Sequence, residues 1–438
     1  MSEPTPGSNT VDRRMALARE WDELVEQVRK LEGFEDFLMP PKLETLLPAA
    51  DRGPVVIVNV SRWRCDGLIV RPDGVTVRPL EQLTLAETTD QANRYLAALQ
   101  EAESADIQRL EARTVRPDES PRSAARRRLH ADLAVEQAQK RVDEMLLNLQ
   151  EWMWRTVAEP ILDELGLTAA PQGDTATWPR IWWCPTGPLT LLPLHTAGHH
   201  VEAAAGASPP RTVLDRVVSS YTPTLRALVE ARRPRDGNAA EGPDRMLLVD
   251  VPDPAGQVPL DTSAERTVLL DVFTPERRTV LEGEFATRDA ARAALPEHRW
   301  VHFSCHGQQH LDDPSRGGLL LRDATLTIAD ITESRFHGDF AGLSACKTAV
   351  GGVDLLDEAI TLAAALHYTG YRHVVAALWS VDSDTSAEVF TELYREVVTD
   401  GRMEPDRAPA ALHRAVRSLR DRHPDWPHRW TPFTHTGP

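Results

Sequence analysis

The stretch Trp300-Val301-His302-Phe303-Ser304-Cys305-His306-Gly307 begins with a run of apolar, β-branched and aromatic residues and ends at a glycine. Such a run predicts a buried β-strand over 300–304 that stops just before His306. Similar runs and segments with helical patterns surround it, and we predict strands over 246–251, 340–344 and 373–379 and helices over 356–369 and 385–397. This alternation predicts an α/β fold with a mostly parallel sheet and helices on both faces.

The first part of the chain has a different pattern, which predicts an α-rich region with a small β-meander. Apolar residues at helical spacing indicate a helix over 17–28. Three short runs around a turn at Pro72-Asp73-Gly74 indicate strands, at 55–60, 67–70 and 75–77. Thr84 and Glu87 have the spacing of a capping box, so we expect a further helix to begin there.

The boundary between this region and the rest is expected to be loose. A polar stretch rich in Arg and Pro at 114–128 predicts a linker, and a helical stripe resumes at 142–153. We place the boundary near Pro160. The chain then divides into an N-terminal region, residues 1–160, and a larger domain, residues 161–438.

Composition restricts the class of partner. Of the 438 residues, 41% are hydrophobic and 26% are charged, values of an ordinary folded protein. The formal net charge of -17 repels phosphate backbones and anionic membranes, so we expect a protein or peptide partner and no direct binding of nucleic acid or membrane. With no signal-peptide pattern and no apolar run of about 20 residues, we predict a cytoplasmic protein. The sequence leaves the oligomeric state open.

Cysteine usage indicates free thiols. Cys65, Cys184, Cys305 and Cys346 are scattered, without the paired spacing of a zinc site or a disulfide framework. We therefore expect neither a metal nor a structural disulfide.

Two of the predicted strands end at residues with matched chemistry. His306 follows the strand over 300–304, and Cys346 follows the strand over 340–344. Functional groups collect at the carboxyl ends of parallel strands, so if these strands are neighbours the imidazole faces the thiol. Cys346 is then a candidate nucleophile with His306 as its base, and the amides of Gly307 and Cys346 are candidates for an oxyanion hole. Cys305 should point to the opposite face and belong to the core.

Two alternatives remain open. His302, His306 and His310 are spaced by four, which on a helix would align three ligands of a zinc-dependent hydrolase. The β-branched and aromatic run before Gly307 argues for a strand instead. The second alternative is a catalytically silent scaffold that binds a protein partner, although a scaffold needs neither a thiol nor an imidazole at these strand ends.

These residues also resemble a known family. The blocks at His302–Gly307, Leu343–Thr348 and Ala377–Asp382 look like the three signature blocks of CHAT-domain proteins, caspase-like peptidases related to separase. Further matches lie at Trp183–Leu189, at Tyr221–Leu225 and at Trp430–Phe433, so the resemblance runs from about Ile161 to the C-terminus.

The resemblance implies a caspase-like fold and a cysteine endopeptidase with His306 and Cys346 as its dyad and with no metal or organic cofactor. It also implies regulation, because activation of many members is coupled to a sensor or protein partner, and a role in antiviral defence, in which several bacterial members take part. The N-terminal β-meander would then be part of a regulatory or pseudo-caspase lobe.

Asp382 and Asp384 follow the last predicted strand, where caspase-like enzymes build the wall of the substrate pocket. A carboxylate there would favour Arg or Lys before the scissile bond. The alternative is that Asp382 or Ser383 caps the helix that follows.

Overall fold

The computed structural model of the protein describes residues 8–31, 34, 37–114, 116, 119–206, 208–234, 244–253, 259–308, 313–334, 336–344, 361–379 and 381–438. The chain forms two compact units, residues 1–48 and 49–438. The first unit contains helix α1 (Ser8–Arg29), which includes the helix predicted over 17–28, and the short helix α2 (Leu43–Leu46).

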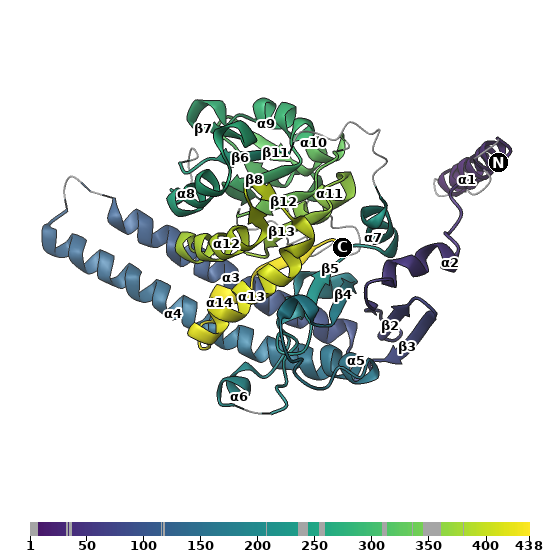
Figure 1. Ribbon diagram of the computed structural model, residues 1–438, viewed down its shortest axis with the longest axis horizontal. Coiled ribbons are helices and arrows are strands. Elements are labelled where there is room, and N and C mark those ends of the chain that lie inside the picture. Colours follow the sequence, from purple (N-terminus) through teal and green to yellow (C-terminus); the bar gives the residue numbers. More distant parts are fainter. Residues whose placement is uncertain are drawn as a thin grey trace, which may run out of the picture. The chain divides into compact units, whose positions relative to one another are not determined.

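The second unit is built around a large mixed sheet (Figure 1). Within the described residues this sheet has 11 strands in the order β3-β2-β1-β4-β5-β16-β13-β12-β8-β6-β7. The strands are β1 (Val55–Asn59), β2 (Asp66–Arg71), β3 (Gly74–Pro79), β4 (Arg180–Pro185), β5 (Val218–Tyr221), β6 (Met246–Asp250), β7 (Arg278–Glu282), β8 (Trp300–Ser304), β12 (Phe340–Leu343), β13 (His373–Ala377) and β16 (Phe433–Thr436). Most neighbouring pairs are parallel, which confirms the predicted fold class.

The predicted β-meander is part of this sheet. Strands β1, β2 and β3 pair in antiparallel fashion, and β1 then pairs with β4 in parallel, with Val55 opposite Trp182. Residues on both sides of Pro160 therefore contribute to one sheet and lie in one compact unit. A division of the chain near Pro160 remains a prediction.

Helices cover both faces of the sheet because its central strands are apolar on both sides. On β6, Met246 and Leu248 pack into one buried cluster, while Leu247 and Val249 pack into another. The first cluster includes apolar residues of α8 (Ser263–Val272), α12 (Ser383–Val397) and α13 (Ala408–Arg422); the second includes those of α9 (Arg288–Ala294), α10 (Ile328–Thr332) and α11 (Leu362–Thr369).

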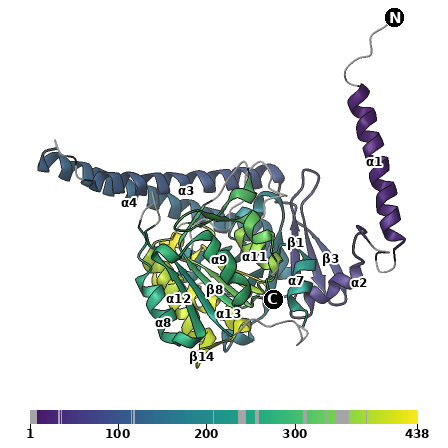
Figure 2. The same ribbon diagram turned by 90° about the horizontal axis from the view of Figure 1, so that it is seen from above.

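Two long helices, α3 (Leu85–Arg113) and α4 (Pro121–Met153), form an antiparallel hairpin (Figure 2). Ser120 caps α4 and Pro121 occupies its first turn, so the linker predicted over 114–128 is wrong from Pro121 onward. Proline is favoured in a first helical turn because its missing N–H has no partner there in any case.

The capping box predicted at the start of α3 is only half formed. The Thr84 side chain accepts a hydrogen bond from the Glu87 amide. The Glu87 carboxylate instead accepts a hydrogen bond of 2.8 Å from Trp152 Nε1. Glu87 therefore holds α3 against the end of α4.

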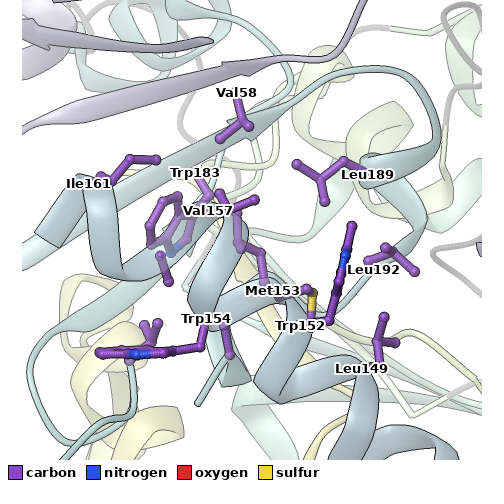
Figure 3. Packing of buried hydrophobic residues seen from close by; sticks show 14 of the residues in the cluster. Val58, Leu149, Trp152, Met153, Trp154, Val157, Ile161, Trp183, Leu189 and Leu192 are labelled. Carbon is purple, nitrogen blue, oxygen red and sulfur yellow. The ribbon is translucent and has the colours of Figure 1, made fainter. Parts of the chain in front are cut away.

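The end of α4 anchors the hairpin to the sheet (Figure 3). The helix continues through a π-helical turn, Trp154–Ala158, into α5 (Glu159–Glu164). Met153, Val157 and Ile161 point from this segment into a buried cluster that contains Val58 of β1 and Trp183 of β4.

The remaining α-helices and strands are short. They are α6 (His200–Ala204), α7 (Leu225–Arg232), α14 (Pro427–Trp430), a three-stranded sheet of β9 (His306–Gln308), β10 (Gly318–Leu320) and β11 (Thr325–Thr327), and a hairpin of β14 (Val398–Thr399) and β15 (Arg402–Met403). None of the helices in the described ranges is both long and apolar enough to cross a membrane.

A buried ion pair joins α13 to the segment before β5. Asp215 accepts two hydrogen bonds from Arg420, of 2.8 and 2.9 Å, and one of 2.6 Å from Thr212 Oγ1. Burial by itself raises the pKa of this carboxyl, but the bonds from Arg420 and Thr212 outweigh it and lower the pKa to about 2. The pair therefore favours the folded state whenever Asp215 is ionised.

We expect Asp215→Asn to lower the free energy of unfolding by about 3 kcal/mol at pH 7, because it leaves Arg420 without its buried partner. The folded-state pKa lies below the usual value of 3.8, so this stabilisation is complete above about pH 5 and is lost as the pH falls toward 2. Urea unfolding of the wild type and the variant from pH 7 to pH 3 measures the difference, which should narrow as the pH falls.

Asp421→Asn is the matched control, since Asp421 also binds Arg420 but is exposed. Asp421→Asn should lower the free energy of unfolding by less than about 1 kcal/mol. Equal losses in the two variants, or a difference for Asp215→Asn that does not change with pH, would contradict the assignment.

Candidate active site

Strands β8 and β12 are adjacent and parallel in the middle of the sheet. Phe340 lies opposite Trp300 and Leu343 lies opposite Phe303, and the Ser344 amide donates a 3.1 Å hydrogen bond to the Phe303 carbonyl. The condition set by the sequence, that these strands be neighbours, is therefore met. The chain leaves both strands at the same edge of the sheet.

His306 lies just beyond this edge. After Ser304 the chain leaves the main sheet, and His306 begins β9 of the small sheet, opposite Leu320 of β10. Gly307 lies opposite Leu319. His306 is half-buried, which keeps the imidazole accessible from outside the core.

Cys346 lies outside the described residues, as does the rest of 345–360. Ser344, two residues before it, is the last described residue of this segment. The pairing of Cys346 with His306 and the oxyanion hole formed by the amides of Gly307 and Cys346 therefore stay predictions.

The three described cysteines are buried and form no disulfide with one another. Cys305 is fully buried in the cluster that contains Phe303 and Leu343, as predicted for a core thiol. Burial raises the pKa of the Cys184 thiol to about 12, and its Sγ donates to the Pro223 carbonyl at 3.4 Å. Cys65 is buried beside the Ser61 carbonyl. Such thiols react slowly with electrophiles.

The zinc alternative loses one of its ligands. His302 lies on strand β8 and not on a helix, and it is completely buried. Its Nδ1 is 2.8 Å from the Tyr394 hydroxyl and its Nε2 is 3.2 Å from Glu265 Oε2, so both ring nitrogens already have partners. His310 lies outside the described residues.

Glu265 is a buried carboxylate at the ends of these strands. It comes from α8 and accepts hydrogen bonds from Ser304 Oγ at 2.7 Å and from Ser344 Oγ at 2.5 Å, in addition to its contact with His302. Burial disfavours its charged form, but the hydrogen bonds from His302, Ser344 and Ser304 outweigh this and lower the pKa of Glu265. The site therefore holds a buried negative charge.

The sequence reasoning did not single out Glu265. A signal was present, because Glu265 lies three and four residues before Val268 and Leu269, which form the buried face of α8. A glutamate on the apolar face of a short helix needs buried partners.

Asp382 and Asp384 lie at the start of α12, after strand β13. Asp382 caps the helix: its carboxylate accepts hydrogen bonds from the Thr385 amide at 2.9 Å and from Thr385 Oγ1 at 2.7 Å. Asp384 is exposed in the first turn, where the helix dipole favours an acidic group. The alternative capping role of Asp382 is thus observed, and the pocket role of both residues stays a prediction.

A family model described as the CHAT domain matches residues 147–438, about two thirds of the sequence. The chain belongs to the CHAT-domain family. The match includes both strands that lead to the candidate dyad. Among curated protein sequences, none matches this chain significantly.

The fold of this CHAT-domain protein resembles two solved structures of the Saccharomyces cerevisiae separase–securin complex. Their TM-scores are 0.52 and 0.53, at 10% and 11% sequence identity, and each similarity covers 90% of this chain. The chain spans about a third of the length of those separase chains, 31% and 30%. The similarity confirms a caspase-like fold and leaves activity to be tested.

We expect Gly342→Ala to destabilise this CHAT-domain protein by about 2 kcal/mol, because a larger side chain does not fit the packed core. A Cβ at Gly342 would lie 2.7 Å from His302 Nδ1 and 2.8 Å from the Tyr394 hydroxyl oxygen. Thermal or urea unfolding measures the loss. The loss should be smaller in the background of Tyr394→Phe, which removes one of the two clashing atoms. An equal loss in both backgrounds would show that the Tyr394 hydroxyl does not contribute to the clash.

Proposed function

We propose that this protein is a cysteine endopeptidase that uses Cys346 as nucleophile and His306 as general base. The thiolate of Cys346 attacks the carbonyl carbon of the scissile peptide bond, and the imidazolium of His306 protonates the leaving amine. Water deprotonated by His306 then hydrolyses the acyl-enzyme on Cys346. The amides of Gly307 and Cys346 are the proposed donors to the oxyanion.

The parallel pairing of β8 and β12 carries this proposal. It brings Ser304 and Ser344 to one edge of the sheet, and each lies two residues before a member of the proposed dyad. Two residues of extended chain span about 7 Å at most, so the backbone of each member of the proposed dyad can lie no farther than that from its serine. The alternative scaffold function requires no such convergence.

We extend the proposal to regulation by a protein partner. The two separase structures contain securin. In this chain, Tyr95 of α3 packs edge-on against Trp379, with ring centroids 5.6 Å apart, so the helical hairpin contacts the segment between β13 and Asp382. A partner bound to the hairpin can thus act on the proposed pocket wall. A role in bacterial antiviral defence remains a prediction from the family resemblance.

Thiol labelling tests the dyad without requiring a known substrate. We expect a peptidyl electrophile to label Cys346 in preference to Cys65, Cys184 and Cys305, because those three thiols are buried. His306→Ala should slow labelling of Cys346 at least tenfold, since the thiolate loses its imidazolium partner. Peptide mapping by mass spectrometry identifies the labelled cysteine, and Cys346→Ala is the control.

Equal labelling of all four cysteines would contradict the proposal, as would labelling of Cys346 that is unchanged in His306→Ala. Either result would favour the scaffold. Bound zinc found by metal analysis, together with activity that resists thiol alkylation, would instead favour the zinc-dependent hydrolase.

Asp382→Asn separates the capping role of Asp382 from the proposed pocket role. Asparagine caps helices about as well as aspartate, so we expect the free energy of unfolding to change by less than about 0.5 kcal/mol. If Asp382 selects a basic residue, the ratio of labelling rates for Arg- and Leu-terminated electrophiles should fall at least fivefold. Asp384→Asn tests the second predicted pocket residue in the same way, and an unchanged ratio in both variants would remove the pocket prediction.

A further inference from the structure

The carboxylate of Glu265 joins four elements around the proposed site. It comes from α8 and binds Ser304 at the end of β8 and Ser344 immediately after β12. Ser344 Oγ is also 2.8 Å from Ser386 Oγ of α12. Tyr394, from the same helix, reaches the network through His302.

The hydrogen-bond directions follow from the charge on Glu265. An ionised carboxylate only accepts, so Ser304, Ser344 and His302 Nε2 all donate to it. Because the Ser344 hydroxyl donates to Glu265, it must accept from Ser386. The Tyr394 hydroxyl, 2.8 Å from His302 Nδ1, stays protonated because burial and the charge of Glu265 raise its pKa well above the usual range. A single protonation of Glu265 would disrupt this order.

The structure assigns Glu265 as a positioning residue for the proposed reaction. Its two serine contacts hold the end of β8 and the residue that follows β12 at a set separation. This inference rests on the proposed function, because it concerns the residues that follow those strand ends.

The fold does not require the hydrogen bonds of Glu265 to the strand ends. The backbone ladder between β8 and β12 already fixes their register through Leu343. A hydrophobic side chain at position 265 would extend the cluster that Val268 and Leu269 join, without the desolvation cost of a buried carboxylate. Two of its donors are instead Ser304, the last residue of β8, and Ser344, the first residue after β12, where a shift of the chain displaces the reacting groups directly.

The pH dependence of Cys346 alkylation by iodoacetamide tests this role, with peptide mapping at each pH. In the wild type the rate should follow a low apparent thiol pKa that rises in His306→Ala. In Glu265→Gln, which keeps the size of the side chain, we expect that pKa to rise by about one unit and the rate at pH 6 to fall about tenfold. The strand ends that lead to His306 and Cys346 are then held less firmly, and the thiolate loses part of its pairing with the imidazolium. Ser344→Ala keeps the Glu265 carboxylate but removes its hydrogen bond to the residue after β12, and should slow alkylation of Cys346 about threefold.

Asp215→Asn is the matched control, because it removes another buried carboxylate, one that lies in the segment before β5 and binds Arg420 of α13. It should leave the pH profile unchanged. If Glu265→Gln fails to fold by circular dichroism, Ser344→Ala and Ser304→Ala carry the test.

The outcomes separate the two proposals. Alkylation of Cys346 that depends on His306 but is unchanged in Glu265→Gln and Ser344→Ala would overturn the role of Glu265 alone. An equal shift in Asp215→Asn would also overturn it, since the effect would then come from general loss of stability. Alkylation that does not depend on His306 in the wild type would overturn the proposed function and this inference together.

Discussion

The parallel hydrogen bonding between β8 and β12 is the constraint on which the rest of the site depends. Parallel strands present their carboxyl ends at one edge of a sheet, and the register of this pair places Leu343 opposite Phe303. Two segments separated by nearly 40 residues therefore leave the core side by side. Helices on both faces then bury the strands, so that a shift of the register would disrupt side-chain packing on both faces.

Polar groups buried at that edge add a second constraint. His302, Ser304, Ser344 and Tyr394 would each be costly in an apolar core, and Glu265 supplies or shares their partners. A network of this kind is stabilising only when every member is bonded. It ties the end of β8 and the residue that follows β12 to α8 and α12.

Local patterns predicted much of the fold. The strands at 300–304 and 340–344 and the β-meander follow from short apolar runs between turn residues, because burial on a pleated sheet selects such runs. The errors came from contacts distant in sequence. Trp152 binds the carboxylate of Glu87 that was assigned to a capping box, and the charged residues after Pro121 continue a helix because α3 packs along it. The small sheet that begins at His306 has strands of three residues, too short to give a pattern.

The sequence by itself determined the fold class, the candidate residues His306 and Cys346 and the core position of Cys305, because period-two burial and strand-end placement are local properties. Only the tertiary structure decided that β8 and β12 are neighbours, that the meander joins the main sheet and that Glu265 lies beneath the strand ends. Those facts depend on strand order and on helix packing, which bring together residues far apart in the chain. The spacing of residues along a single sequence does not predict which side chains will bind a buried carboxylate.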